Sequence, residues 1–444
     1  MKNIKLSFKI LKQRMIIFAL ILITFFIPQM TQNENSIDAR VLITALGIDK
    51  KQNEYEVSAQ VFIPSKTSTT KDIISATDKS VTLAAEKLFI NTVRLAVPAT
   101  CQMIVLGKDL VEQENVMNTL DYILRKNIIS WNAIIVTGEK SAVETLKGLN
   151  KLEEKSSMGW QSLYNISERG FDMVAVKVRD FAKGVYGLTG TSLLPIVEAK
   201  DTPPENQGGS SGSSDGGGGG SSGGSSSQGS VSLSENDCIF TQSDGGSQGQ
   251  SSQGSSEENK GQGPQLKLIP DTLVFFRGKK IARLNKDQTE GINWLSKKAL
   301  FHSFTLENIG GYYFKDSKVS LSLKNQKIKI KSKFDSNPTM DVKIDANFTL
   351  VEVMRSDIPL IAGKHDHVER SELLSKKIND FIEKQVRDAF ETGKEKDADV
   401  FNFVPYFFKF HNKQYNKYMS TGRKVTDLLK DIELKLDIKT DVEV

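Results

Sequence analysis

Hydrophobic and polar residues follow two different periods in the first part of the chain. Residues 40–48 are mostly apolar, and residues 55–63 alternate between apolar and mostly polar side chains after a polar stretch at residues 49–54. A period of two is typical of β-strands, so we expect two strands joined by a turn that includes Asp49. From Ser80 the period becomes that of an amphipathic helix. Its apolar residues are Val81, Ala84, Ala85, Leu88 and Phe89.

Further short strands and helices follow in alternation. The apolar stretches "CQMIVLG" and "NAIIVTG" predict strands, and a helical stripe that ends in Arg125 and Lys126 lies between them. Cations suit a helix C-terminus, which supports this assignment. Another helix begins near Ser141. The alternation predicts a mixed α/β lobe over residues 37–200. No glycine-rich phosphate loop follows any of these strands, so the pattern does not support a nucleotide site.

Residues 201–265 break the pattern. The stretch "GGSSGSSDGGGGGSSGGSSSQGS" cannot bury enough apolar surface to offset its ordering entropy. We therefore expect a disordered Gly/Ser-rich linker that joins two lobes, including its short apolar island "VSLSENDCIF". A flexible chain of about 60 residues has an r.m.s. end-to-end distance of roughly 40–45 Å.

Ordered patterns resume at residue 266 and predict a second lobe over residues 266–444. "DTLVFFRGKKIARLN" predicts two strands about Gly278, followed by a short helix at residues 287–296. Later stretches alternate with one apolar and one polar face, as in an antiparallel sheet. The later elements are strands around residues 319–323, 342–350 and 432–438, and a long charged helix from about residue 374 to 390. The fold class we predict is α+β, with a C-terminal antiparallel sheet backed by one long helix.

Residues 1–30 have the features of an export signal. Five cations and no acid precede an apolar run over residues 15–28, which places the N-terminus in the cytoplasm and the remainder across the membrane. The run is followed by neither a cysteine for lipid attachment nor a clear small-x-small cleavage site. We therefore expect an uncleaved signal anchor. The alternative is a signal peptide cleaved near residues 36–39.

Charge and cysteine content limit the function further. The net charge of +5 equals the five cations of the leader, so the remainder is balanced and nucleic-acid binding is not expected. Cys101 lies in an apolar strand and Cys238 in the Gly/Ser-rich stretch. Two cysteines this far apart predict one buried and one exposed free thiol rather than a disulfide framework, although a single bridge stays an alternative.

The strongest candidate for metal chemistry is "KHDHVER", which offers His365, Asp366, His367 and Glu369 as ligand types. Its spacing matches neither common helical zinc signature. We therefore favour a solvated loop that leads into the long helix, with no metal and no cofactor. His302 and His411 lie in aromatic-rich stretches and are interpreted as packed side chains. No nucleophile–histidine–acid pattern is present.

Three segments, in this order, resemble the Ger(x)C family, the C subunits of spore nutrient germinant receptors. They are "ARVLITALGIDKKQNEYEVSAQVFIP", "LVFFRGKKIARLNKDQTEGINWL" and "DADVFNFVPYFFKFHNKQYNKY". The third segment is similar to the family's Asp-Val-Phe-Gly-Phe-Gly sequence, with Asn402 and Val404 in place of the two glycines. Asn tolerates a positive φ better than Val does. The family's lipid-accepting cysteine is also absent.

The resemblance implies a non-enzymatic receptor subunit needed for nutrient-triggered germination. It further implies two integral membrane subunits as partners and a place on the outer face of the spore inner membrane. The aromatic third segment is a candidate interaction surface for a partner or for lipid headgroups. Its candidate residues are Asp399, Phe401, Phe403, Tyr406 and Phe407. For Asp399 a turn or helix-cap role is the other interpretation.

Two other classes of function stay open from the residues alone. An exported metal-dependent cell-envelope hydrolase would hold its metal at His365, His367 and Glu369. A solute-binding protein would need two lobes joined by short hinge strands, which a linker of about 60 residues makes unfavourable.

Overall fold

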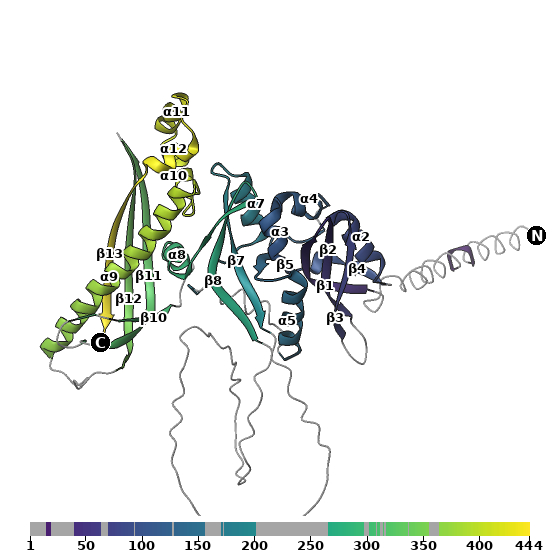
Figure 1. Ribbon diagram of the computed structural model, residues 1–444, viewed down its shortest axis with the longest axis horizontal. Helices are drawn as coiled ribbons and strands as arrows, with labels where there is room; N and C mark the ends of the chain where they lie inside the picture. The colour runs from purple at the N-terminus through teal and green to yellow at the C-terminus, as the bar shows by residue number, and fades with distance from the viewer. Residues whose placement is uncertain are drawn as a thin grey trace, which may run out of the picture.

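The computed structural model describes residues 15–18, 40–63, 70–92, 94–126, 128–155, 170–171, 173–200, 265–296, 302–307, 309–310, 314, 317–335, 337–354 and 364–444. They form two lobes, with the N-terminal lobe on the right of Figure 1 and the C-terminal lobe on the left. Of the predicted anchor, only a helical turn at residues 15–18 is described. Within the described ranges, no helix is long and apolar enough to cross a membrane. The predicted Gly/Ser linker and Cys238 lie outside these ranges.

The N-terminal lobe is built on a nine-stranded mixed sheet. The strand order is β3-β2-β1-β5-β6-β7-β8-β9, and the short strand β4 pairs with β1. The central strands β1, β5, β6 and β7 are parallel, whereas the strands on either side pair antiparallel. The strands are β1 (Arg40–Lys51), β2 (Glu54–Ile63), β3 (Thr70–Asp78), β4 (Leu95–Val97), β5 (Met103–Leu106), β6 (Ile134–Gly138), β7 (Thr191–Lys200), β8 (Gln265–Phe276) and β9 (Lys279–Leu284).

Helices cover both faces of this sheet. Helices α2, α4 and α7 bury Leu88, Leu120 and Phe181 in a cluster on one face. Helix α5 buries Leu146 against Ala45 and the neighbouring strands on the other face. Coverage of both faces explains why the parallel strands are continuous apolar runs. The helices are α2 (Val81–Ile90), α3 (Lys108–Gln113), α4 (Val116–Lys126), α5 (Ala142–Lys155) and α7 (Val178–Tyr186), with a short 3₁₀ turn at Pro98–Thr100.

The Gly/Ser-rich insert connects two neighbouring strands of this one sheet. Strand β7 ends at Lys200 and β8 begins at Gln265, and these two residues are register partners in an antiparallel pair. The prediction that the insert joins the two lobes, and that residues from 266 on belong to the C-terminal sheet, is corrected here. Sequence patterns identify strands but not their partners, and a long loop between paired strands costs only slightly more closure entropy than a short one.

The C-terminal lobe contains a four-stranded sheet in the order β10-β11-β12-β13. The first three strands are antiparallel, as predicted, but β13 pairs parallel to β12 over the whole length of β13. The expectation of a fully antiparallel sheet is therefore corrected. The chain between β12 and β13 includes a long helix, and such a crossover lets the last strand return in the same direction. The strands are β10 (Ser303–Leu306), β11 (Lys318–Phe334), β12 (Pro338–Met354) and β13 (Glu433–Glu443).

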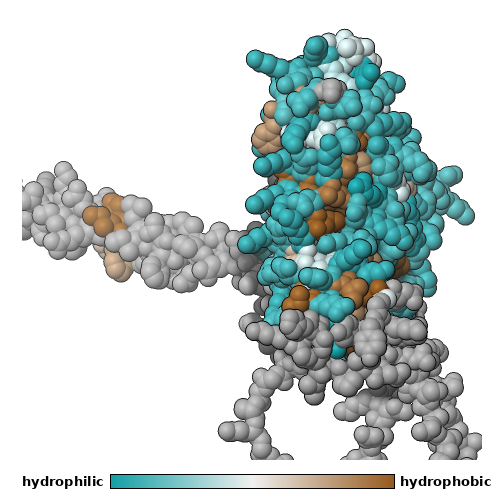
Figure 2. Space-filling model, turned by 90° about the vertical axis from the view of Figure 1, so that its left-hand side faces the viewer, coloured by the Kyte–Doolittle hydropathy of each residue, from teal (hydrophilic) through white to brown (hydrophobic). Residues whose placement is uncertain are grey.

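Helix α9 (Lys364–Glu395) covers one face of this sheet and runs the length of the lobe (Figure 1). Its buried residues recur every four positions, which is the stripe expected of an amphipathic helix. They are Leu374, Ile378, Ile382, Val386 and Phe390. Three short helices follow it, namely α10 (Val404–Phe410), α11 (Asn412–Ser420) and α12 (Val425–Asp431). The side of this lobe seen in Figure 2 is largely hydrophilic, with apolar residues in separate patches.

Helix α8 (Lys286–Asn293) joins the two lobes. It begins directly after β9, and its start is closed by a capping box between Asn285 and Gln288. The amide of Asn293 donates to the carbonyl oxygen of Phe171 at 2.8 Å. At Gly291 the helix approaches α9 so closely that a Cβ atom would lie 2.2 Å from the carbonyl oxygen of Gln385. The α8–α9 crossing therefore depends on the absence of a side chain at Gly291.

An apolar cluster between the lobes adds to this contact. It includes residues of the N-terminal sheet and of α8, together with residues of α9 and the segment after it. Its buried members are Val274, Leu284, Ile292, Ala389, Ala398 and Val400. Because the described interface is apolar and closely packed, we expect the two lobes to behave as one body.

Cleavage within the insert should leave the two fragments associated, because the break falls between strands that are paired in one sheet. A specific protease site in place of residues 220–226 allows a clean cut, and size-exclusion chromatography of the cut protein gives the readout. We expect the fragments to elute together at the position of the uncut chain. Separate elution of the two fragments would contradict the β7–β8 pairing.

Replacing Gly291 with alanine should destabilise the protein, although Gly→Ala on an exposed helix stabilises by about 1 kcal/mol. The added methyl group overlaps the backbone of α9, and overpacking of this kind costs roughly 1–3 kcal/mol. Denaturant unfolding measures the change. Lys376→Ala, on the exposed side of α9, is the control and should change stability by less than about 0.5 kcal/mol. A Gly291→Ala protein as stable as the parent would show that α8 does not press on α9.

Candidate functional site

The family-like segment after α9 begins with a buried carboxylate. The Oδ1 atom of Asp399 accepts from the backbone N–H of Phe403, and its Oδ2 atom accepts from that of Val404, both at 2.8 Å. Its own backbone N–H donates to the hydroxyl of Thr191, the first residue of β7, at 3.1 Å. Asp399 is 5% exposed. It therefore caps α10 and also holds the segment against the N-terminal lobe, which agrees with the helix-cap interpretation.

Burial raises the pKa of the Asp399 carboxyl from 3.8 to about 6. The hydrogen bonds from the backbone at Phe403 and Val404 favour the charged form and limit this rise. Both carboxyl oxygens accept from backbone N–H groups at the start of α10. The carboxyl therefore supports the start of a helix.

The two positions that replace the family's glycines have different conformations. Asn402 has a φ of +56°, in the left-handed region that Asn tolerates better than most residues. Val404 is the first residue of α10 and needs no positive φ. The turn is therefore compatible with both substitutions, and the sequence expectation for Asn402 agrees with the structure.

Most of the predicted interaction residues lie in the core of the C-terminal lobe. Phe403 and Phe407 are fully buried, and Phe401 stacks on Phe403 with ring centroids 5.1 Å apart. Phe401 and Tyr406 are half-buried. The fully buried pair is thus not on the surface of this structure. The exposed aromatic side chains of the segment are instead Phe408 and Phe410, 48% and 60% exposed.

Helical periodicity contains the signal that separates these two groups. In α10, Val404 and Phe407 are three positions apart and face the core, whereas Phe408 and Phe410 fall on other sides of the helix. Density of aromatic residues alone does not tell core from surface. The residue at which the helix begins does tell them apart, because it decides which of the following positions face the core.

A buried polar network connects α8 to α9. The indole N–H of Trp294 donates to Oε1 of Gln385 at 2.8 Å, and the Gln385 amide donates to Oε2 of Glu290 at 2.6 Å. All three side chains are at most 3% exposed. Sequence patterns did not indicate this network, because its members are 91 and 95 residues apart along the chain. Networks of this kind make a docking geometry specific.

His302 lies beside this network. Its ring stacks on Phe171 with centroids 4.3 Å apart and on Phe304 at 5.1 Å. Burial lowers the pKa of His302 to about 3, so the imidazole is neutral at neutral pH. Its Nε2 atom lies 3.8 Å from Oε2 of Glu290, which is too long for a hydrogen bond. The interpretation of His302 as a packed side chain agrees with these contacts.

The side chain of His411 contacts the C-terminal sheet. Its Nε2 atom lies 2.8 Å from the carbonyl oxygen of Ser332 in β11. This contact joins the α10–α11 junction to the end of the sheet.

The candidate metal ligands lie at the start of α9 rather than in a loop before it. Residues 365, 367 and 369 are all within the helix, and His367 and Glu369 are exposed. The side chain of His365 is outside the described part of the structure. Among the described residues, no three His, Cys, Asp or Glu side chains are grouped as a metal site requires.

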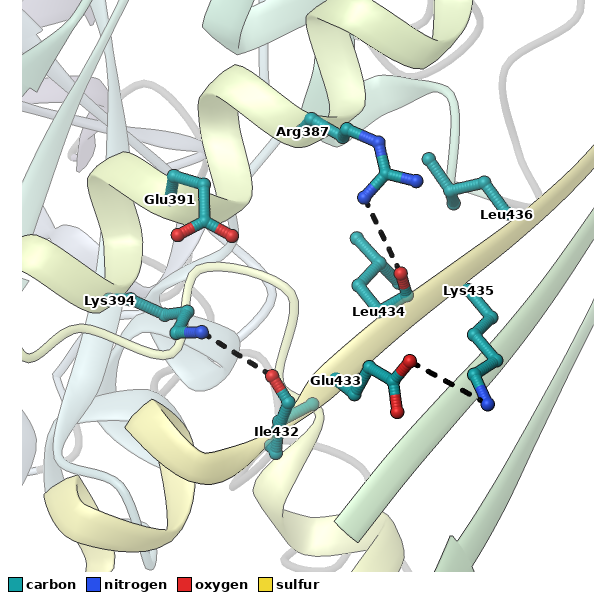
Figure 3. Close-up of a pocket in the computed structure, with 8 residues that line it drawn as sticks. All are labelled: Arg387, Glu391, Lys394, Ile432, Glu433, Leu434, Lys435 and Leu436. Atoms are coloured by element: carbon teal, nitrogen blue, oxygen red, sulfur yellow. Dashed lines mark hydrogen bonds and ion pairs between the residues drawn. The ribbon is translucent and has the colours of Figure 1, made fainter. Parts of the chain in front are cut away.

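A groove of about 480 Å³ lies between α9 and β13 (Figure 3). Arg387 donates to the carbonyl oxygen of Leu434 at 3.5 Å, and Lys394 donates to that of Ile432 at 3.4 Å. Strand β13 is an edge strand, and these cations contact the carbonyl oxygen of its second residue, Leu434, and that of Ile432 directly before it. Charged side chains along an exposed edge strand discourage pairing with a strand of another molecule. The two cations in the groove are thus explained by protection of this edge.

Two residues of the N-terminal lobe also have structural roles. Asp49, predicted to lie in a turn, lies within β1 and accepts from the backbone N–H groups of Ala142 and Val143 at 2.7 and 3.1 Å. It therefore closes the N-terminus of α5, and the hairpin turn falls at residues 52–53. Cys101 is a buried free thiol, and burial raises its pKa to about 12. It is accordingly unreactive at neutral pH.

Asp399→Asn should make stability less dependent on pH. In the parent, the pKa is 3.8 when the chain is unfolded and about 6 when it is folded, so the folded state binds the proton more tightly. The contribution of this group to stability is therefore greatest below about pH 4 and is lost as pH rises to about 6, by up to about 3 kcal/mol. Asn does not titrate.

Unfolding measured across this pH range for both proteins isolates the effect, because all other groups are shared. We expect the free-energy difference between parent and variant to change by about 1–3 kcal/mol, with the parent losing more stability as pH rises. A difference that is constant with pH would show that Asp399 keeps its ordinary pKa in the folded protein.

Known families match both lobes of the chain. The family described as "Spore germination protein N-terminal domain" matches residues 33–199, and that described as "Spore germination B3/ GerAC like, C-terminal" matches residues 271–444. A solved structure titled "Crystal Structure of the GerBC protein" is 14% identical, covers 90% of this chain and 97% of its own, and has a TM-score of 0.49. No curated protein matches the chain.

The two family matches cover well over half of the chain and follow the order of its two lobes. Their boundaries leave out the insert and the first strand residues after it. The chain belongs to the Ger(x)C family of spore germination proteins.

Proposed function

We propose that this chain is a membrane-tethered, non-enzymatic subunit of a spore nutrient germinant receptor. The observation that carries the proposal is the family match over both lobes, in order and to the last residue. The leader adds a reason for the tether, since five cations precede an apolar run in the first 30 residues. Two integral membrane subunits of the same receptor are the proposed partners, on the outer face of the spore inner membrane.

The use of the buried ionisable groups supports a non-enzymatic role. Asp49 and Asp399 close helix N-termini, and Glu290 belongs to the network between α8 and α9. A catalytic carboxylate needs access to a substrate, and these three are each at most 5% exposed. The placement of these three carboxylates favours a subunit in which buried acids stabilise the fold and do not act on a substrate.

No observation favours the two alternative functions. A solute-binding protein opens and closes about a cleft, whereas Ile292 and Ala389 pack in an apolar cluster between these lobes. A metal-dependent hydrolase would need the candidate ligands at the start of α9 to converge, and the exposed His367 and Glu369 have no described third ligand.

Deletion of the gene in the spore-forming host should slow or abolish germination in response to one class of nutrient. Germination is followed as the loss of optical density of a spore suspension, and a non-nutrient trigger serves as the control. Expression of the full chain should restore the response, whereas Gly291→Ala should restore it less, because that variant disturbs the contact between the lobes. Normal nutrient germination of a deletion strain without a paralogue would contradict the proposal.

A further inference from the structure

The top of the C-terminal lobe in Figure 1, where α10, α11 and α12 lie, has an unusual charge composition. From Val400 to Thr426 the chain contains no acidic residue. Over the same stretch it contains five cations, namely Lys409, Lys413, Lys417, Arg423 and Lys424. The chain beyond the leader is balanced as a whole, so these five cations are offset by an acidic excess elsewhere, and this stretch is locally and strongly basic.

Four of these cations, Lys424 and the three lysines of α10 and α11, have no described acidic partner. Arg423 pairs with Asp431 at 2.8 Å, which neutralises it. Lys409, Lys413 and Lys417 form no ion pair with any described acid, and all three are exposed. Lys413 and Lys417 are four positions apart on α11, a spacing at which like charges repel each other. An external anion would relieve this repulsion.

Exposed aromatic rings lie directly beside these lysines. Phe408 and Phe410 flank Lys409 in α10, and the Lys409 ammonium group lies 5.0 Å from the centre of the Phe410 ring. Phe408 contacts Tyr415 of α11 edge-on, with centroids 5.4 Å apart. We call Lys409, Lys413, Lys417, Phe408 and Phe410 the basic–aromatic tip.

The orientation of the tip is fixed by the core beneath it. Phe407 and Tyr415 anchor α10 and α11 in the apolar cluster of the lobe. Lys409 is two positions after Phe407, and Lys413 and Lys417 are two positions on either side of Tyr415. Positions two apart in a helix point in nearly opposite directions, so all three lysines face away from the core. The contact between His411 and Ser332 holds the junction of the two helices on the sheet.

A planar, anionic partner with an apolar interior fits this surface. The tip offers exposed cations and phenyl rings at the end of the lobe. Lysines near an anionic membrane each favour binding by roughly fivefold, and phenyl rings enter the headgroup region.

We propose that the basic–aromatic tip docks on the anionic headgroup surface of the membrane to which the chain is tethered. The inference rests on the proposed tether, because three lysines and two phenyl rings bind weakly unless the membrane is held nearby. Docking would fix the C-terminal lobe at the membrane by a second contact, far along the chain from the leader.

The test uses the full chain with an environment-sensitive dye on a cysteine at the tip. The variant carries Cys238→Ser and Gln414→Cys, and Cys101 is buried and does not react. Gln414 is exposed and lies next to Lys413. A second labelled variant, Glu86→Cys with Cys238→Ser, places the dye on an exposed position of α2 in the other lobe. The protein is mixed with vesicles of phosphatidylcholine, with and without phosphatidylglycerol.

We expect the tip dye to shift to shorter wavelength only with phosphatidylglycerol, and high salt to reverse the shift. Joint replacement of Lys409, Lys413 and Lys417 by Gln should weaken docking by about a hundredfold. Replacement of Phe408 and Phe410 by Ser should weaken it as well. The matched control replaces Lys376, Lys377 and Lys384 of α9 by Gln, which removes the same charge from exposed positions of the same lobe and should leave the shift intact.

Two results would overturn the proposal. One is a tip dye that responds equally to both kinds of vesicle or to neither. The other is a shift caused by an acidic polypeptide such as poly-glutamate but not by vesicles, which would make the tip a protein-binding surface. Retention of the chain on carbonate-washed vesicles reports the tether separately, and the dye reports docking whether or not the chain is retained.

Discussion

The close crossing of α8 and α9 at Gly291 is the contact on which the arrangement of the two lobes depends. Helix α8 follows β9 directly and is therefore fixed to the N-terminal sheet, while α9 forms the backing of the C-terminal sheet. Where the helices meet, the backbone of α9 occupies the place of a side chain at Gly291. This close approach brings Trp294 and Glu290 within hydrogen-bonding reach of Gln385, which α9 supplies. The close packing of α8 on α9 and the hydrogen bonds between them therefore both depend on Gly291.

Buried carboxylates in this protein serve its architecture. Asp49 reaches from the central strand β1 to the start of α5, and Asp399 reaches from the interlobe segment to the start of α10. In each case a carboxylate satisfies backbone N–H groups that a helix cannot satisfy internally. Because these two carboxylates stabilise helix N-termini, we look for the function of the protein on its surface and not at its buried acids. That conclusion agrees with the proposed role as a receptor subunit that contacts partners and a membrane.

The Gly/Ser-rich insert lies within the N-terminal lobe, between β7 and β8, and does not connect the two lobes. Its ends are register partners in one sheet, so it does not set the distance between the lobes. The lobes are instead held by α8, by the segment around Asp399 and by the apolar cluster that includes Val400. A signal received by one lobe would pass to the other through packed contacts, without a flexible tether between them.

The sequence by itself determined the elements and the family. Strong periodicity predicted β2, α2, α4, β12 and the long helix α9, because side chains that alternate or recur every three to four residues can bury only one face. Motif order identified the family, and Asn402 was recognised as a residue able to adopt a positive φ. Local patterns carry these features, so no knowledge of distant contacts was needed.

Only the tertiary structure decided which elements are neighbours. Sequence periodicity does not reveal that β8 pairs with β7 across the insert or that β13 runs parallel to β12. It did not reveal that Asp49 caps α5 from a position 93 residues away. Nor could the density of aromatic residues in this run separate buried Phe407 from exposed Phe410, since the phase of α10 decides which of them faces the core. Strand pairing, distant capping and burial are set by contacts between residues far apart in the chain, and those contacts exist only once the chain has packed.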